Sequence, residues 1–177
     1  TGDETLATAE PRRIGQLRAR IPLYDFSSLR VEADESRYYT VQTSIVAAGM
    51  QSILYNRMVA YDRSTMATVW DSSRWEPGRG EATALTYDAV TFLATPTVFG
   101  NRLLAPVMHS GAYALMCMDR ETGRPLWRTR VHAGGSNFAR APGTVVQVQD
   151  GNAYVLTNAG ALAAIDADTG DLRWIRK

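Results

Sequence analysis

The segment AIDADTGDLRW, residues 164–174, decides the fold of this chain because its pattern occurs three times. Residues 117–127, CMDRETGRPLW, match it with Asp, Thr, Gly and Trp in register. Residues 60–70, AYDRSTMATVW, form a weaker copy in which Met66 takes the place of the glycine. In every copy an aspartate precedes a tryptophan by eight positions. Self-similarity of this kind indicates a protein built from repeated structural units.

Each copy is the second half of a longer unit. Upstream of the two later copies, Pro96 and Pro142 each begin an apolar run, a polar turn and a second apolar run. β-Branched and aromatic residues dominate these runs, and helical periodicity is absent. We therefore predict an all-β fold of four short strands per unit, with the units at about residues 38–70, 96–127 and 142–177.

Two segments do not fit the repeat. The turn aspartates Asp62, Asp119 and Asp166 are separated by 57 and then 47 residues, and we assign the extra length to an inserted loop at 71–95. Residues 1–37 are predicted to be a lead-in or linker, since their first part is polar and poor in aromatics. Strict alternation at 17–21 predicts one strand within it.

The spacing within each copy follows from turn chemistry. Asp and Thr side chains hold a tight turn through bonds to nearby backbone groups, and glycine takes a backbone conformation with positive φ. For the first copy two alternatives stay open: either its turn differs, or Met66 adopts the same turn with about 1 kcal/mol of strain. The small residue two positions before each aspartate leaves room beside the indole.

This pattern resembles the repeat of quinoprotein-type, or PQQ-like, β-propellers. The resemblance covers about residues 38–177 and implies that each unit is a propeller blade whose tryptophan docks against the neighbouring blade. The docking residues it implies are Ala164, Asp166, Thr169, Gly170 and Trp174, then Cys117, Asp119, Thr122, Gly123 and Trp127, and in the degraded copy Ala60, Asp62 and Trp70.

About three blades are too few to close a ring, since propellers typically have four to eight. We therefore expect a β-propeller fragment whose ring is completed by missing sequence or by another chain. The first partners that we predict are the remaining blades of the same or another chain.

Composition limits the other partners and the chemistry. The formal net charge of +1 gives no reason to expect nucleic acid as a partner. No apolar run is long enough for a membrane span. The single cysteine, Cys117, lies in an apolar run and is expected to be a buried, inert thiol. We predict no catalytic, cofactor-binding or metal-binding residues; His109 and His132 lie on different segments and form no ligand cluster.

The resemblance implies a non-catalytic scaffold or protein-interaction platform, periplasmic or otherwise extracytoplasmic, similar to the outer-membrane assembly lipoproteins. The inserted loop offers a possible partner contact at Arg74, Trp75, Glu76 and Arg79, because Trp beside Arg is typical of interface anchors. The alternative is a segment of a PQQ-dependent alcohol or sugar dehydrogenase, with PQQ and Ca²⁺ as cofactors. The sequence shows neither the paired cysteines common in those enzymes nor a cluster of calcium ligands.

Overall fold

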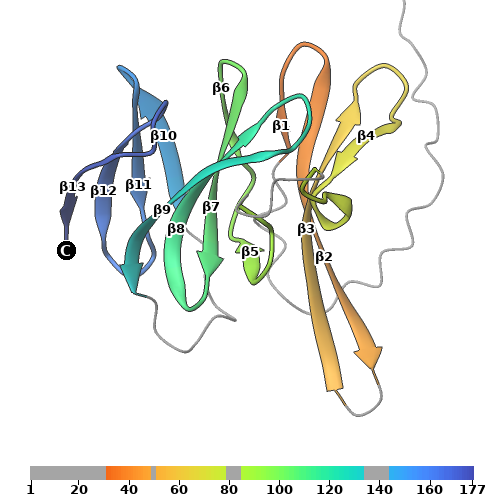
Figure 1. Ribbon diagram of the computed structural model, residues 1–177, viewed down its shortest axis with the longest axis horizontal. Helices are drawn as coiled ribbons and strands as arrows, with labels where there is room; N and C mark the ends of the chain where they lie inside the picture. The colour runs from red at the N-terminus through yellow and green to blue at the C-terminus, as the bar shows by residue number, and fades with distance from the viewer. Residues whose placement is uncertain (1–30, 49–50, 79–84, 134–143) are drawn as a thin grey trace, which may run out of the picture.

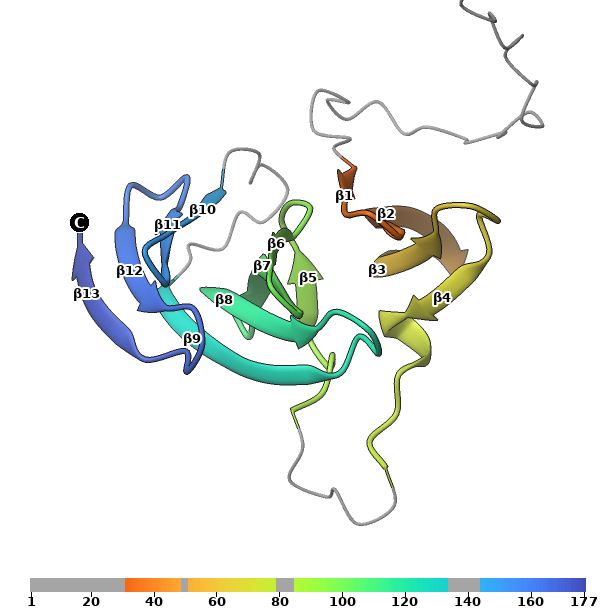
Figure 2. The ribbon, with the colours of Figure 1, turned by 90° about the horizontal axis from the view of Figure 1, so that it is seen from above.

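The computed structural model describes residues 31–48, 51–78, 85–133 and 144–177 of the chain. These ranges form antiparallel β-sheets that stand side by side (Figures 1 and 2), which confirms the predicted all-β class. The strand predicted at 17–21 lies outside the described residues. We name the sheets I, II and III in chain order.

Sheet I is a four-stranded meander dominated by one long hairpin. Its strands are β1 (Glu32–Ala33), β2 (Arg37–Ala48), β3 (Gln51–Asp62) and β4 (Thr68–Asp71), in that spatial order. The sheet thus begins inside the segment predicted to be a lead-in, and that boundary was placed too late. The reason is a short turn, in which the Asp34 carboxylate accepts hydrogen bonds from the N–H groups of Ser36 and Arg37 at 2.8 Å each.

Sheet II contains five strands because the strand at its first edge is broken in two. Its strands are β5 (Val90–Phe92), β6 (Thr97–Phe99), β7 (Arg102–His109), β8 (Ala112–Asp119) and β9 (Pro125–Ala133). Both β5 and β6 pair with β7, at opposite ends of that strand. The ladder ends at Phe92 and resumes at Thr97, and prolines without an N–H lie in both chains of this gap, Pro96 between β5 and β6 and Pro106 opposite them in β7.

The segment 71–95 is not a loop throughout, contrary to the prediction. Its first residue ends β4, residues 72–74 form a single 3₁₀ turn, η2 (Ser72–Arg74), and β5 joins sheet II. Asp71 caps the turn by accepting a hydrogen bond from the Ser73 N–H, and it pairs with Arg57 at 2.6 Å. The sequence did not predict η2 and β5 because each is only three residues long and too short to show a periodicity.

Sheet III has four strands in sequential order, as predicted. They are β10 (Val145–Gln149), β11 (Asn152–Leu156), β12 (Leu162–Asp166) and β13 (Leu172–Arg176). The turn between β10 and β11 places Asp150 and Gly151 at positive φ, the pattern of a tight hairpin whose twist matches that of its strands.

The hydrophobic core lies between the sheets and is divided by sheet II. One face of sheet II packs against sheet I through residues such as Leu103, Met116 and Met118, all with no solvent exposure. The alternate residues, among them Leu115 and Cys117, pack against Ile165 and its neighbours in sheet III. Strand alternation therefore gives the central sheet two buried faces, which explains the nearly continuous apolar sequence of β7 and β8.

Candidate functional site: sheet contacts and the open face of sheet III

The three aspartate turns have the same internal geometry. One carboxylate oxygen of Asp62, Asp119 or Asp166 accepts hydrogen bonds from the backbone N–H groups two and three residues later, at 2.8–3.0 Å. The carbonyl of the same aspartate accepts a bond from the N–H four residues later. Met66 makes this bond at φ 58°, close to the 71° of Gly123. Of the two alternatives for the first copy, the strained turn is therefore the one found.

The recurring small residues lie beside the tryptophans. Ala60 is the cross-strand partner of Trp70, Cys117 that of Trp127, and Ala164 that of Trp174. Each of the three small side chains is at most 2% exposed.

Two of the three indoles lie on a glycine of the next sheet. A Cβ atom added to Gly123 would come within 2.7 Å of the Trp70 ring, and one added to Gly170 would come within 2.6 Å of the Trp127 ring. The Trp70 indole N–H also donates to the Arg120 carbonyl at 3.0 Å, and that of Trp127 donates to the Asp168 carbonyl at 3.2 Å. Thr122 and Thr169 stay within their own turns, where their hydroxyls accept from the N–H two residues on.

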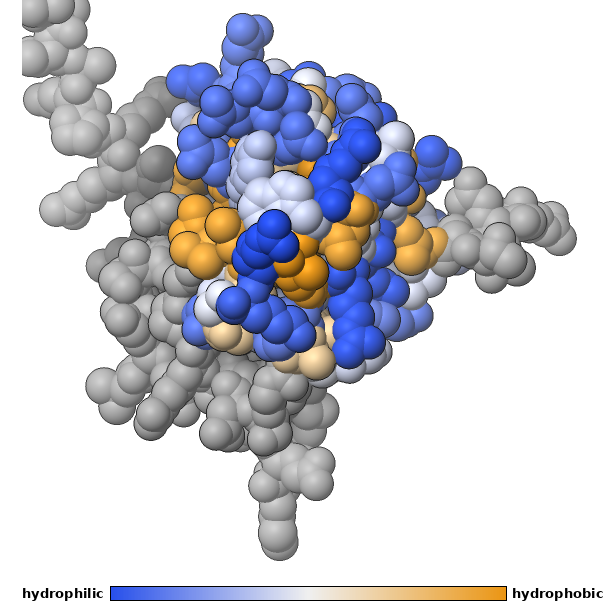
Figure 3. Space-filling view, turned by 90° about the vertical axis from the view of Figure 1, so that its left-hand side faces the viewer, coloured by the Kyte–Doolittle hydropathy of each residue, from blue (hydrophilic) through white to orange (hydrophobic). Residues whose placement is uncertain are grey.

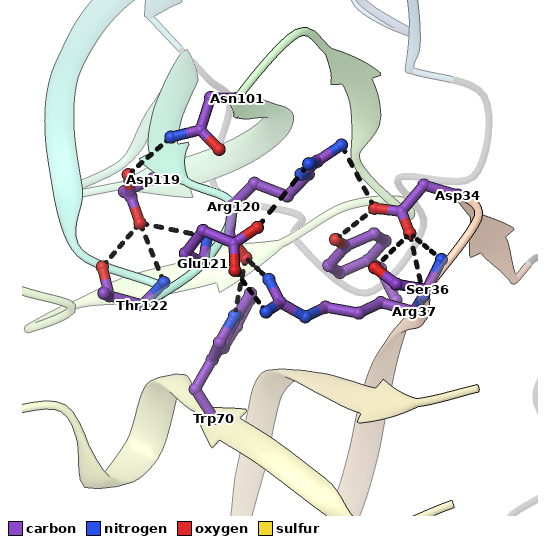
Figure 4. A network of polar contacts seen from close by, with 10 residues as sticks. Asp34, Ser36, Arg37, Trp70, Asn101, Asp119, Arg120, Glu121 and Thr122 are labelled. Atoms are coloured by element: carbon purple, nitrogen blue, oxygen red, sulfur yellow. Dashed lines mark hydrogen bonds and ion pairs between the residues drawn. The ribbon is translucent and has the colours of Figure 1, made fainter. Parts of the chain in front are cut away.

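A polar network joins sheets I and II around this contact (Figure 4). Arg37 donates to the Arg120 carbonyl at 2.9 Å and forms an ion pair with Glu121. Arg120 in turn lies 3.5 Å from the Asp34 carboxylate, which also accepts a bond from the Tyr39 hydroxyl at 2.7 Å.

The network fixes the charge of Asp34. Burial alone would raise the pKa of this carboxyl, but the bonds from Tyr39, Ser36 and Arg37 outweigh it and lower the pKa to about 2. Burial and the neighbouring Asp34 raise the pKa of Tyr39, which stays a hydrogen-bond donor.

Sheets II and III meet in a corresponding way. Arg102 donates to the Asp168 carbonyl, and its guanidinium lies 3.5 Å from the Asp168 carboxylate. Sequence reasoning missed both Arg37 and Arg102. They precede the aspartate with which they pair across the hairpin by 25 and 17 residues, so the unequal hairpin lengths conceal their common position.

The third indole has no sheet beyond it among the described residues. Trp174 is 38% exposed, compared with 9% for Trp70, and lies on the outer face of sheet III. Figure 3 views this face and shows hydrophobic patches on it, separated by hydrophilic residues. Val145 and Leu156, paired across β10 and β11, are also exposed there.

The residues of the 71–95 segment that were predicted to contact a partner differ in their exposure. Arg74 and Glu76 are exposed, whereas Trp75 is half-buried with its ring edge-on to Tyr87, 6.0 Å between centroids. Tyr87 donates its hydroxyl to the Gly123 carbonyl, which ties this segment to the turn of sheet II. Arg79 lies outside the described residues.

Residues of this segment line an open groove. Trp75, Glu76 and Gly78 form one side of a space of about 430 Å³, and Asp119, Thr122 and Arg124 of the sheet II turn form the other. An adjoining hollow reaches Trp70 and Asp71 in sheet I. The groove therefore combines residues from both sides of the first sheet contact.

The side chains that could take part in catalysis have the surroundings of structural residues. Cys117 is buried, and burial raises the pKa of its thiol to about 11. Burial, followed by the charge of Arg128, lowers the pKa of His109.

In the described part of the chain, no three His, Cys, Asp or Glu side chains gather as a metal site would require. Across the same ranges, no helix has the length and apolarity to cross a membrane.

The contact between indole and glycine can be tested with matched alanine substitutions. Gly170→Ala and Gly160→Ala both place a side chain at similar positive φ, 81° and 83°, but only the first meets an indole. We expect Gly170→Ala to lower the free energy of unfolding by about 1–3 kcal/mol more than Gly160→Ala, because overpacking adds to the shared backbone strain. Urea unfolding measures both, and equal losses would contradict the contact.

The aspartate turns predict a loss of stability in acid. The N–H of Thr169 and the Arg173 guanidinium lower the pKa of Asp166 to about 2 from its ordinary 3.8. Because the folded pKa is the lower one, this carboxylate contributes stability above about pH 4 and loses it as the pH falls towards 2. Asp166→Asn should flatten the dependence of unfolding free energy on pH in that window. Asp88→Asn, outside the turns, serves as the control, and identical slopes for both variants would refute the expectation.

Comparison with known proteins supports the fold. The structure resembles the quinohemoprotein alcohol dehydrogenase ADHIIG from Pseudomonas putida HK5, with a TM-score of 0.52 and 15% identity over 83% of this chain and 26% of that one. It also resembles BamB from Moraxella catarrhalis, with a TM-score of 0.50 and 17% identity over 84% of this chain and 48% of that one. The chain thus spans about a quarter and about half of these two structures. No curated protein sequence matches it.

The sequence comparison is more specific. Residues 54–177 match the family described as outer membrane protein assembly factor BamB. Together with the three adjoining sheets and the likeness to two PQQ-like propellers, this match confirms the predicted partial β-propeller. Since it covers more than half of the sequence, the chain belongs to the PQQ-like β-propeller family described as outer membrane protein assembly factor BamB.

Proposed function

We propose that the chain is a non-catalytic propeller scaffold that binds other proteins outside the cytoplasm. The observation that carries this proposal is the groove between the segment after η2 and the sheet II turn, in which Trp75 and Glu76 lie opposite Thr122 and Arg124. The family description, an outer membrane assembly factor, supports both the scaffold role and the compartment.

The groove suits a protein partner better than an enclosed small molecule. It is open, its lining is mixed polar and apolar, and its walls come from the segment after η2 and from the sheet II turn. The bond from the Tyr87 hydroxyl to the Gly123 carbonyl ties these two walls together. A half-buried tryptophan next to charged groups is the composition of many interface anchors. Because Trp75 packs on Tyr87, its ring is already ordered before binding, which lowers the entropy lost in a complex.

The scaffold proposal predicts that Trp75 anchors a partner. A photo-crosslinking amino acid at Glu76, introduced in cells, should capture a protein, and Trp75→Ala should reduce that capture on the order of tenfold, as expected for an interface anchor. Trp75→Phe is the matched control, since it keeps a ring against Tyr87. Unchanged capture in Trp75→Ala, or no captured protein, would argue against the groove as a binding site.

The proposal also predicts that the protein does not catalyse quinone-dependent oxidation. Incubation with pyrroloquinoline quinone and Ca²⁺ should give neither a bound quinone absorption band nor dye-linked oxidation of alcohols. Reproducible turnover under these conditions would overturn the scaffold proposal in favour of the dehydrogenase alternative. Cell fractionation tests the compartment separately, with recovery in the cytoplasmic fraction contradicting it.

A further inference from the structure

The paired strands β2 and β3 extend far beyond their neighbours in sheet I. Each is 12 residues long, whereas β1 pairs only with Tyr38 and Tyr39 of β2, and β4 pairs only with Val59–Tyr61 of β3. We call the two-stranded remainder, residues 40–48 and 51–58, the arm. Figure 1 shows that it projects past the strands of sheet II.

The arm is fixed where it leaves the sheets. The Asn56 side-chain amide donates to the Phe92 carbonyl at 3.1 Å and accepts from the Phe92 N–H at 2.7 Å, so it takes the place of a strand beside β5. Arg57 donates to the side chain of Gln42, its partner across the arm, at 2.9 Å. These contacts hold the base of the arm, and among the described residues no third strand continues along it.

The backbone groups that face the open edge of β2 can be identified from the ladder. In an antiparallel sheet both backbone groups of one residue point to the same side, and those of the next residue point to the opposite side. The Ser36 carbonyl accepts from the Arg63 N–H on the side of β3, whereas the Arg37 carbonyl accepts from the Asp34 N–H on the side of β1. Odd-numbered residues therefore point away from β3. On the arm these are Val41, Thr43, Ile45 and Ala47.

This edge lacks the usual protection against pairing. Exposed edge strands commonly carry charged side chains that keep other strands away. Residues 38–56 contain no charged residue, although 21% of the whole chain is charged. A lipid bilayer would not satisfy the free N–H and C=O groups, since hydrocarbon offers no hydrogen bonds. A further β-strand would satisfy them, so the edge suits a protein partner.

The opposite edge of the arm, along β3, is partly occupied. By the same alternation, the even-numbered residues of β3 face that edge. The N–H of Met58 there already donates to the Ser72 hydroxyl at 2.9 Å, and η2 packs against β3. Among the described residues, β2 therefore presents the longer unoccupied edge.

The four free residues of β2 are placed symmetrically about Ser44. When two copies of β2 lie antiparallel with Ser44 opposite Ser44, Thr43 pairs with Ile45 and Val41 pairs with Ala47, and every free group of both edges is bonded. A shift by two residues would place Ala47 opposite Tyr39, which β1 already covers, or Val41 opposite residue 49, past the end of β2. Because the edge is uncharged, no like charges meet in the symmetric register.

We propose that the free edge of β2 is a surface for a second copy of this chain, and that two arms pair about a two-fold axis at Ser44 into one four-stranded sheet. Such a contact uses the same patch on both copies, so it closes at the dimer and leaves no free β2 edge. The proposal is independent of the scaffold function, because its tests do not involve the groove at Trp75.

A cysteine at the axis tests the register directly. In the 177-residue chain with Cys117→Ala, Ser44→Cys places two sulfurs on opposed residues whose Cα atoms lie about 4.5 Å apart, within the range for a disulfide. We expect mild oxidation to give a covalent dimer on a non-reducing gel. In the matched control, Val46→Cys, the two cysteines are offset by four residues, roughly 13 Å, and should stay unlinked. Equal linking of both variants, or none with Ser44→Cys, would overturn the proposal.

Matched prolines test the edge without a cross-link. Ile45 and Leu54 are opposite each other in the arm, but the N–H of Ile45 faces the β2 edge and that of Leu54 faces the β3 edge. Analytical ultracentrifugation should show a reversible dimer of the unmodified chain. Ile45→Pro should weaken it on the order of tenfold, since two hydrogen bonds per dimer are lost, and Leu54→Pro should leave it unchanged. A monomer at all concentrations, or equal weakening by both prolines, would contradict the proposal.

Amide hydrogen exchange identifies the occupant of the edge without any substitution. The N–H groups of Val41, Thr43, Ile45 and Ala47 should become protected as the protein concentration rises. Protection that is independent of concentration would show that the chain's own residues before β1 cover the edge. Protection that requires another protein, or phosphatidylcholine vesicles, would show a different occupant. Each of these three results would overturn the proposal.

Discussion

The architecture depends on the close approach of an indole ring to a stretch of backbone that carries no side chain. At Gly123 and Gly170 the ring occupies the space in which any Cβ atom would lie, so the turn and the tryptophan that covers it require each other. The turn is held in this shape from within, by one aspartate carboxylate that accepts two backbone bonds. Burying an indole contributes a few kcal/mol, and its N–H is satisfied by a carbonyl of the same turn.

The arginines beside these indoles contribute differently. Partly exposed ion pairs such as that of Arg102 with Asp168 contribute at most about 1 kcal/mol each, so they add little to the stability of the stacked sheets. They satisfy polar groups instead, since each guanidinium donates to the carbonyl that also accepts the indole N–H. Apolar packing therefore holds the sheets together, and the charged pairs satisfy the polar groups at the edge of that packing.

The sequence predicted those features that recur at a fixed spacing. The aspartate turns, the small residues beside the tryptophans and the four strands of sheet III all follow from the repeat, because local turn chemistry fixes their separation. The arginines were missed because the length of a hairpin varies without changing the register at its base, which places Arg37 and Arg102 at different distances from their aspartates. The strand β5 escaped notice because three residues carry too little periodicity, and Asp34 because its turn joins a strand of only two residues. Which residues form a groove, as Trp75 does with Thr122, depends on contacts between segments far apart in the sequence, and no local pattern encodes these.

Met66 shows what the turn itself requires and what it does not. Its N–H donates to the Asp62 carbonyl at φ 58°, so the first turn accepts the strain of a left-handed backbone, about 1–2 kcal/mol for a residue other than glycine. The glycines at 123 and 170 are therefore required less by the turn than by the indole that lies on each of them.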